Sequence, residues 1–303
     1  MRHISIWKKI RNDLSYLLAL AVIRFLRILP RPVAIKFMRL LARFVFLFAK
    51  KERRKIVRHL SMAYGSEKTP EEIQKICKNV FLHFFSVVTD YVRLPGMSRD
   101  DINKMVTVDG VENLKKAYAK GKGVILLTAH FGNWELLGAW TAQNGFPLKV
   151  VGKRLFDQHF DKLVVNIRNE AGYGNISRGN GTKEIIRTLG KGQGIGMLID
   201  QDTDVQGVFV DFFGHPAHTA SAPFRLAKKY DTPIIPIFAR LRSDFSYHIE
   251  CLEPVAIADS ADEDQDMVDT LQRCSDAIEQ FIRQYPEQWA WMHRRWKKQP
   301  EKI

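Results

Sequence analysis

From Val106 onward, short runs of apolar residues alternate with segments of helical periodicity, and this alternation is the strongest constraint on the fold. The runs "VILLTA" and "IGMLID" are apolar almost throughout, as expected for strands of a sheet that is covered on both faces. The segments between such runs, for example "NWELLGAWTAQNG", end in glycine, which is typical of helix ends. The sequence therefore predicts an α/β fold with a mostly parallel central sheet and helices on both faces.

Further segments extend this pattern. Strands are expected at "VTVDG", "LKVVGK" and "TPIIPIFAR", and "FSYHIECLEPV" is expected to close the sheet as an antiparallel edge strand. Ahead of the sheet, Thr69, Pro70 and Glu72 form a capping-box pattern that predicts the start of a helix. The acidic run "DSADEDQD", residues 259–266, is expected to be a solvated loop before the last helix.

The net charge of +14 is confined to the N-terminal part of the chain. Residues 1–58 hold sixteen Lys and Arg against Asp13 and Glu52, and the remaining residues are balanced. No recognition-helix or single-strand-binding motif accompanies the charge, which argues against a nucleic-acid partner. Three widely spaced cysteines favour a reducing compartment without a disulfide framework.

The basic N-terminal segment is also apolar. Its uncharged runs are shorter than the roughly 18 to 20 residues that a membrane-spanning helix needs. The pattern indicates N-terminal amphipathic helices that lie on an anionic membrane surface, with core helices that expose a basic face as the alternative. We therefore expect membrane-associating helices over residues 1–60 and an α/β domain over residues 61–303. The apolar positions at helical spacing in the first helix are Leu14, Leu17, Leu18, Ala21, Val22, Phe25 and Leu29, and Lys36, Arg39 and Arg43 share one stripe of the second.

The stretch "TAHFGNWELLG" places His130 and Glu135 across a predicted strand-to-helix junction. On one continuous helix, residues five apart would diverge by about 140°, so the two side chains can meet only if His130 lies in the loop. Gly132 could supply the tight turn, and Asn133 is a good helix N-cap. Glu135 would then accept a hydrogen bond from the imidazole and make His130 a general base. A buried histidine that merely satisfies backbone groups is the alternative.

Other motifs follow in order: "GKR" after the next strand, "LIDQD", "VDFFGHPAHTASAPFRLAKKYDTPIIPIF" and "PEQWAWMHRRWK". With "HFGNWE", they resemble the bacterial lipid A late acyltransferases, a branch of the HxxxxD/E lysophospholipid acyltransferase superfamily. The similarity runs from about residue 10 to residue 298. This resemblance implies a catalytic His130–Glu135 dyad and an active-site role for Arg168, for which a solvated helix residue is the alternative.

Additional residues are candidates for binding the substrate. Lys153 and Arg154 follow a predicted strand and could bind phosphate of the acceptor, or they could be an ordinary exposed pair. Asp200 and Asp202 end another strand at the same sheet edge, where a carboxylate could orient Arg168 or the acceptor, or they could be an ordinary strand-to-loop terminus. Backbone amides near Asn133 could stabilise an oxyanion. The resemblance implies that the segment with Gly214 and Thr219 shapes the substrate cleft.

The resemblance implies an enzyme that moves a fatty acyl chain from a thioester, usually acyl carrier protein, to a hydroxyl of a lipid acceptor. A lipid A precursor of the Kdo2-lipid IVA type is the expected acceptor, and the cytoplasmic face of the bacterial inner membrane is the expected location. Alternatives are another glycolipid or lysolipid acceptor, such as a phosphatidylinositol mannoside, a lipid hydrolase, or a non-catalytic membrane-binding protein. No metal or other cofactor is expected. The C-terminal segment with Trp289, Trp291 and Trp296 is expected either at the lipid boundary or as a cap over the core.

Overall fold

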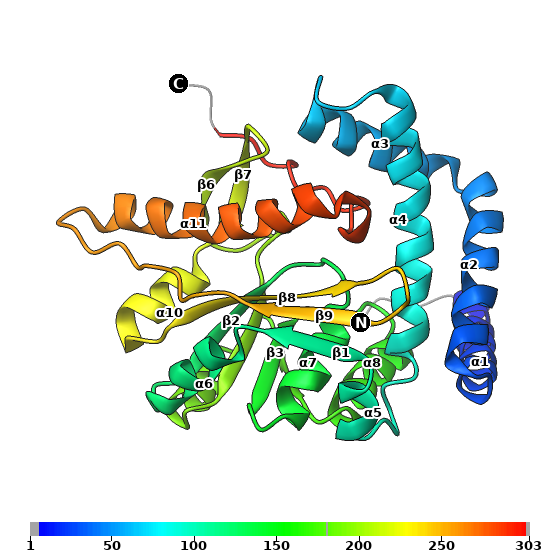
Figure 1. Ribbon diagram of the computed structural model, residues 1–303, viewed down its shortest axis with the longest axis horizontal. Coiled ribbons are helices and arrows are strands. Elements are labelled where there is room, and N and C mark those ends of the chain that lie inside the picture. The colour runs from blue at the N-terminus through cyan, green and yellow to red at the C-terminus, as the bar shows by residue number, and fades with distance from the viewer. Residues whose placement is uncertain (1–5, 180, 301–303) are drawn as a thin grey trace.

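The computed structural model describes residues 6–179 and 181–300, so the ends of both expected parts, residues 1–5 and 301–303, lie outside the described residues (Figure 1). A seven-stranded sheet forms the centre, in the order β1-β9-β8-β2-β5-β3-β4. All neighbours in it are parallel except β8 and β9. The strands are β1 (Val106–Asp109), β2 (Val124–Thr128), β3 (Leu148–Gly152), β4 (Gly174–Ser177), β5 (Gly194–Leu198), β8 (Ile234–Leu241) and β9 (Tyr247–Cys251).

The predicted closing strand is antiparallel, but its expected place at the sheet edge is wrong. Strand β9 pairs with β8 on one side and with β1, in parallel, on the other. Strand β1 is the edge, and its alternating half-buried and exposed residues suit that position. Four residues of β9 pair with β1, which precedes β9 in the sequence, so the side of β9 opposite β8 is not an open sheet edge.

Helices cover both faces of the sheet, which confirms the predicted α/β class (Figure 1). One core contains apolar side chains of β2, α6, α7 and α8, and another contains β5, α9, α10 and α11. The helices on the first face are α5 (Arg99–Asn103), α6 (Val111–Ala119), α7 (Trp134–Gln143) and α8 (Gln158–Glu170). Those of the second face are α9 (Thr182–Gly190), α10 (Ala222–Tyr230), α11 (Glu263–Gln284) and the 3-10 helix η1 (Pro286–Gln288).

Four helices precede the sheet: α1 (Ile6–Ile28), α2 (Arg31–Phe48), α3 (Lys50–Tyr64) and α4 (Pro70–Tyr91). The predicted capping box begins α4: Thr69 Oγ1 accepts from the Glu72 amide at 3.2 Å, and Glu72 accepts from the Thr69 amide at 2.7 Å. Helix α3 runs across residue 60, the expected boundary between the two parts, and its Ile56 and Leu60 are fully buried in a core shared with the sheet. That boundary stays a prediction.

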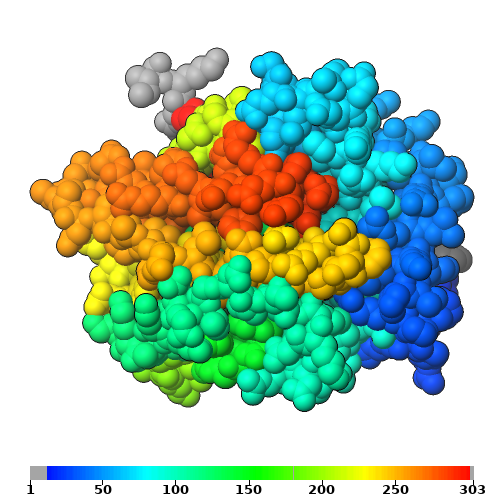
Figure 2. All heavy atoms as spheres, viewed as in Figure 1, coloured from blue at the N-terminus to red at the C-terminus, as the bar shows by residue number. Residues whose placement is uncertain are grey.

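Helices α1 and α2 form one edge of the molecule (Figures 1 and 2). Large apolar side chains of both helices are exposed. Among the described residues, no helix combines the length and apolar character that crossing a membrane requires. The exposed apolar side chains of α1 and α2 are Leu14, Leu17, Leu18, Val22, Phe25, Ile28, Val33, Phe37, Leu40, Leu41, Phe44, Leu47 and Phe48.

A chain of polar contacts links these helices to the sheet. Arg31 at the start of α2 donates two hydrogen bonds of 2.8 Å to the buried carboxylate of Asp90 on α4. The Tyr247 hydroxyl on β9 donates to the same carboxylate at 2.6 Å and accepts from Asn133 Nδ2 at 3.0 Å. Because Asn133 lies directly before α7, the contacts reach the junction that follows β2.

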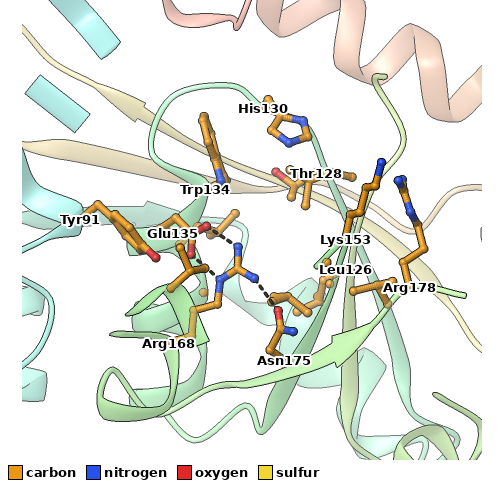
Figure 3. Close-up of a pocket in the computed structure, with 18 of the residues that line it drawn as sticks. Tyr91, Leu126, Thr128, His130, Trp134, Glu135, Lys153, Arg168, Asn175 and Arg178 are labelled. Carbon is orange, nitrogen blue, oxygen red and sulfur yellow. Dashed lines mark hydrogen bonds and ion pairs between the residues drawn. The ribbon is translucent and has the colours of Figure 1, made fainter. Parts of the chain in front are cut away.

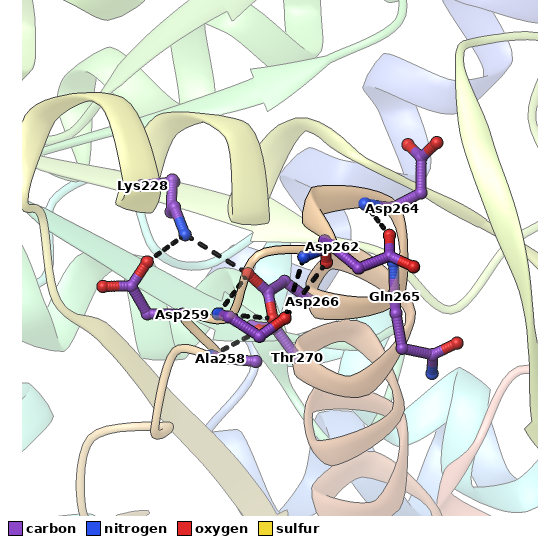
Figure 4. Close-up of polar contacts among 9 residues, drawn as sticks. Lys228, Ala258, Asp259, Asp262, Asp264, Gln265, Asp266 and Thr270 are labelled. Atoms are coloured by element: carbon purple, nitrogen blue, oxygen red, sulfur yellow. Dashed lines mark hydrogen bonds and ion pairs between the residues drawn. The ribbon is translucent and has the colours of Figure 1, made fainter.

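The acidic run before the last helix is more ordered than the solvated loop expected from the sequence (Figure 4). Asp262 caps α11, which begins at Glu263, so the second half of the run is helical. Asp266 is buried, the single N–H of the Ser260 amide donates to both of its carboxylate oxygens, and Asp266 pairs with Lys228 of α10. The acidic residues gather here because they lie at the start of α11, where carboxylates cap and stabilise a helix N-terminus.

The C-terminal segment after η1 lies over the second face as a cap, one of the two expected alternatives. Trp289, Trp291 and Trp296 are buried, with no more than 9% of each side chain exposed. They pack against Phe212 and Phe213 of the hairpin formed by β6 (Gly207–Phe212) and β7 (His215–Ala220). This hairpin is a separate two-stranded sheet that lies beside α11.

Candidate active site

The junction between β2 and α7 has the predicted strand–loop–helix form. Gly132 has a φ of +57°, and an added Cβ would lie 1.8 Å from the carbonyl oxygen of Ala239, so only glycine fits this turn. Asn133 caps α7 by accepting from the Leu136 amide at 2.9 Å. His130 therefore lies in the loop beyond the strand, and Glu135 lies in the first turn of the helix.

The partner of His130 is Asp200, and the predicted hydrogen bond from His130 to Glu135 is wrong. His130 Nδ1 lies 2.9 Å from Asp200 Oδ1, and the His130 amide donates to Oδ2 at 2.8 Å. Strands β2 and β5 are parallel neighbours with Thr128 opposite Leu198, so the residues two positions later meet beyond the sheet edge. The contact of His130 thus comes from the end of the neighbouring strand β5, whereas the sequence predicted a contact within the β2–α7 junction.

Asp200 is a buried carboxylate whose hydrogen bonds keep it ionised. It is 1% exposed and also accepts from Trp289 Nε1 at 2.8 Å. Burial on its own would raise the pKa of Asp200, but the charge of His130 and the hydrogen bonds from His130 and Trp289 outweigh it and lower the pKa to about 2. An ionised carboxylate can only accept, so Nδ1 of His130 carries a proton, and in the neutral imidazole the lone pair lies on Nε2.

Glu135 is instead the partner of Arg168, which lies on α8. Arg168 Nε and Nη2 donate to the two Glu135 oxygens at 3.0 and 2.6 Å. Tyr173 donates a third hydrogen bond to Glu135 at 2.5 Å, and Arg168 Nη1 donates to Asn175 Oδ1 at 2.5 Å. Burial alone would lower the pKa of Arg168, but the hydrogen bonds and charge of Glu135 raise it, so the ion pair is fixed. This pair ties α7 to α8 beside the cavity.

An apolar cavity of about 510 Å³ extends from His130 across the first face of the sheet (Figure 3). Its volume is in the range of small-molecule sites. Lys153 and Arg178 line it near His130 with side chains that point to the same side, whereas Arg154 is exposed in the same loop as Lys153 and does not line it. Apolar wall residues include Val87 and Val88 of α4, Leu126 of β2, Leu137 of α7, Leu148 and Val150 of β3, and Val164 and Val165 of α8.

Two of the predicted substrate-binding residues have structural contacts instead. The buried Asn133 side chain is used by the Leu136 amide and the Tyr247 hydroxyl, and the Asn133 amide donates to the Ala239 carbonyl at 2.9 Å. The buried Asp202 carboxylate accepts from the Lys298 amide at 2.5 Å and does not line the cavity. Both residues hold the chain around the site and have no polar group directed to a ligand in the cavity.

Gly214 and Thr219 do not line the cavity beside His130, and the expectation that their segment shapes the substrate cleft stays a prediction. Gly214 has a φ of +71° in the turn between β6 and β7. Thr219 is fully buried in β7 and accepts from Arg295 Nη2 at 2.6 Å. The motif is explained by the hairpin turn and by its packing against the C-terminal segment.

Several site residues were not found from the sequence: Tyr173, Asn175, Arg178, Trp289 and His293. The ring of His293 lies 5.3 Å from that of His130, and both histidines line the cavity. Burial, and then the charge of His130, lower the pKa of His293 to about 4, so this imidazole is neutral at pH 7. The "PEQWAWMHRRWK" motif marked the segment with Trp289 and His293, but nothing local in it indicated contact with residues 130 and 200.

The fold and the site define an α/β enzyme with a histidine–aspartate pair above an apolar cavity. Residues 7–298 match the family model of the bacterial lipid A biosynthesis acyltransferases, and the chain belongs to that family. It is therefore an acyltransferase of the class that acts in lipid A biosynthesis. The resemblance expected from the sequence motifs is confirmed.

Relatives include both lipid A enzymes and a mannoside enzyme. The chain is 24% identical over 246 residues to the lipid A biosynthesis acyltransferase of Haemophilus influenzae, covering 80% of this chain and 75% of the relative. It is 23% identical over 287 residues to the lipid A biosynthesis lauroyltransferase of Escherichia coli, covering 91% and 89%. It is 26% identical over 156 residues to the phosphatidylinositol mannoside acyltransferase of Mycolicibacterium smegmatis, and this match spans about half of each chain, 50% and 51%.

A solved structure, the 1-acyl-sn-glycerophosphate acyltransferase of Thermotoga maritima, aligns with a TM-score of 0.39 and 12% identity. The alignment covers 84% of this chain and 99% of that one. The likeness is weak, and the assignment of the α/β class depends on the strand order of this chain itself.

The ionised state of Asp200 predicts a pH-dependent contribution to stability. Its folded-state pKa of about 2 lies below the ordinary value of 3.8, so the carboxylate stabilises the fold at neutral pH by roughly 2 kcal/mol, and this is lost as the pH falls from about 4 to 2. We expect Asp200→Asn to lower the free energy of unfolding by about that amount at pH 7, measured by denaturant titration. The difference from the wild type should shrink toward pH 2.

Asp204→Asn is the matched control, because Asp204 is close in sequence but its side chain is fully exposed. It should unfold like the wild type at every pH. An Asp200→Asn variant as stable as the wild type at pH 7 would contradict the assigned role of the carboxylate.

Proposed function

We propose that this acyltransferase moves a fatty acyl chain from the thioester of an acyl carrier protein to a hydroxyl of a lipid A precursor of the Kdo2-lipid IVA type. The observation that carries the proposal is the orientation of His130. Its Nδ1 is engaged by the buried Asp200, and its second nitrogen is available beside an apolar cavity in a chain of this family. The thioester is a co-substrate, and no cofactor is needed for this reaction.

In the proposed reaction, His130 Nε2 takes the proton of the acceptor hydroxyl while its oxygen attacks the thioester carbonyl carbon. The carbonyl π electrons move to oxygen and give a tetrahedral oxyanion. The oxyanion then re-forms the carbonyl, the carbon–sulfur bond breaks, and the thiolate leaves and takes the proton from His130. Asp200 holds the imidazole in the required tautomer and stabilises its protonated form. Glu135 acts as a positioning residue through Arg168, and no covalent acyl-enzyme is formed.

The walls and mouth of the cavity fit the two substrates. The apolar wall suits the acyl chain, since burying each methylene is worth about 0.8 kcal/mol. Lys153 and Arg178 provide two cationic groups on one side of the cavity, which suits an acceptor with sugar-linked phosphates. A phosphatidylinositol mannoside or another glycolipid or lysolipid is the second candidate acceptor, favoured by the similarity to the mannoside enzyme of Mycolicibacterium smegmatis.

We also propose that α1 and α2 hold the enzyme on the cytoplasmic face of the bacterial inner membrane, as a peripheral or monotopic protein. Their exposed apolar side chains are interleaved with basic residues such as Arg24, Lys36 and Arg43. Such a surface binds an anionic bilayer by combining apolar burial with about 1 kcal/mol per basic residue. Nucleic acid is not a proposed partner.

The catalytic proposal is tested with labelled acyl carrier protein and a panel of acceptors, with product masses as the readout. The panel contains the tetra-acylated lipid A precursor with its inner sugars, a phosphatidylinositol mannoside, a lysophospholipid, and no acceptor. We expect one acyl chain to be added to the lipid A precursor and His130→Gln to reduce the rate by about 10² to 10⁴-fold.

His159→Gln is the control for this experiment, because His159 is half exposed at the start of α8 and does not line the cavity. It should retain the wild-type rate. Release of free fatty acid at the same rate without acceptor would instead indicate a hydrolase. Preferential acylation of the phosphatidylinositol mannoside would indicate that the mannoside, and not the lipid A precursor, is the acceptor.

The membrane proposal predicts a loss of vesicle binding when the apolar surface of α2 is made polar. Leu40, Phe44 and Leu47 are each at least 60% exposed and lie on one face of the helix. Replacing all three by serine should weaken binding to phosphatidylglycerol vesicles at least tenfold in a flotation assay, because apolar burial in the bilayer is lost. Ile186→Ser, an exposed apolar residue of α9, should bind like the wild type. Equal binding of the triple variant would contradict the proposal.

A further inference from the structure

Three polar side-chain atoms on the cavity wall are buried without any hydrogen-bond partner in the part of the chain that the structure describes. They are the hydroxyl oxygens of Thr128 and Tyr91 and the amide nitrogen of Gln201. Thr128 is only 6% exposed. A buried donor without an acceptor is destabilising and needs an explanation, such as a ligand that supplies the missing partner.

Thr128 and Gln201 line the same cavity as His130. Thr128 is the last residue of β2, two positions before His130, and Figure 3 shows it next to the imidazole. Gln201 directly follows Asp200 beyond β5, the neighbouring strand. The two unpartnered donors therefore come from the same pair of strand ends that holds His130 against Asp200. Tyr91 is different, because it lies on α4 beside the Glu135–Arg168 pair.

Three of the backbone amides near the start of α7 donate to acceptors within the protein. The Gly132 amide donates to the Gln288 carbonyl at 2.9 Å, and the Asn133 amide donates to the Ala239 carbonyl at 2.9 Å. The Leu136 amide donates to the Asn133 side chain. These three amides are therefore not available to a substrate oxygen near His130, whereas the unpartnered Thr128 hydroxyl and Gln201 amide are.

We propose that the Thr128 hydroxyl and the Gln201 side-chain amide bind the carbonyl oxygen of the acyl thioester and stabilise the oxyanion that forms there. The inference rests on the proposed function and names the groups that receive the negative charge. As the acceptor oxygen bonds to the carbonyl carbon and its proton passes to His130, negative charge develops on the carbonyl oxygen, where the two donors stabilise it. The oxyanion then re-forms the carbonyl as the carbon–sulfur bond breaks, and the thiolate leaves with the proton from His130. The ester product is then released from the two donors. Preorganised donors in a buried site serve this purpose because they need no rearrangement.

The test compares turnover with stability in the same variants. Thr128→Val removes the donor and keeps the shape of the side chain, so kcat should fall about 10² to 10³-fold. The denaturant midpoint should be no lower than that of the wild type, because the hydroxyl has no partner to lose. Thr128→Ser restores a hydroxyl and should recover most of the rate. Gln201→Glu places a negative charge beside the oxyanion and should lose at least as much activity as Thr128→Val.

Thr89→Val is the matched control. Thr89 is fully buried on α4, does not line the cavity, and donates its hydroxyl to the Phe85 carbonyl at 2.8 Å. This variant should lower the denaturant midpoint and leave kcat unchanged, the opposite of Thr128→Val. An unchanged kcat in Thr128→Val would overturn the proposal, and so would a loss of kcat that simply follows a loss of folded protein.

Binding of laurate by calorimetry separates this inference from the proposed function, because laurate presents carboxylate oxygens where the thioester carbonyl would lie. We expect Thr128→Val to weaken laurate binding at least tenfold. If the wild type transferred no acyl chain to any acceptor but laurate binding still depended on Thr128, the proposed function would fail and the carbonyl-binding pair would stand. Laurate that binds equally to both proteins, or to neither, would overturn the pair.

Discussion

The active site depends on one buried carboxylate, that of Asp200. It accepts hydrogen bonds from the amide and the imidazole of His130 and from the indole of Trp289. These three donors belong to the loop after β2 and to the C-terminal segment, so one side chain joins three separate parts of the chain. A buried charge is costly unless it is fully hydrogen-bonded, and the three contacts meet that requirement here. The same contacts fix the tautomer of His130, so packing and reactivity have a common origin.

A second polar chain connects the surface helices to this site. It runs from Arg31 through Asp90 and Tyr247 to Asn133, the cap of α7. Each of these contacts joins buried or half-buried groups, and the fully buried Asp90 accepts three hydrogen bonds, two from Arg31 and one from Tyr247. The apolar surface of α1 and α2 is therefore held at a fixed position relative to His130. Under the proposed function, this places the proposed membrane-binding surface at a fixed distance from the cavity that would take the lipid acceptor.

The sequence predicted the elements of the fold and the form of the β2–α7 junction because these follow from local patterns. Apolar strands, the Thr69 capping box, Gly132 and Asn133 each act within a few residues. It did not predict that β9 is covered by β1, or that His130 contacts Asp200 in preference to Glu135, because both depend on which strands become neighbours. Spacing favoured the acid five residues away, whereas the sheet brings together residues 130 and 200. The roles of Trp289 and His293 were hidden for the same reason.

The most direct test of this account is the ¹⁵N NMR spectrum of the histidine side chains at neutral pH, with the His130 signals assigned by their loss in His130→Gln. We predict that His130 carries its proton on Nδ1 in the wild type and in Glu135→Gln. In Asp200→Asn the proton should move to Nε2, because the His130 amide and the Trp289 indole both donate to one side of residue 200 and turn the new amide nitrogen toward Nδ1. A proton that stays on Nδ1 in Asp200→Asn, or leaves it in Glu135→Gln, would contradict the central claim that Asp200 controls the histidine.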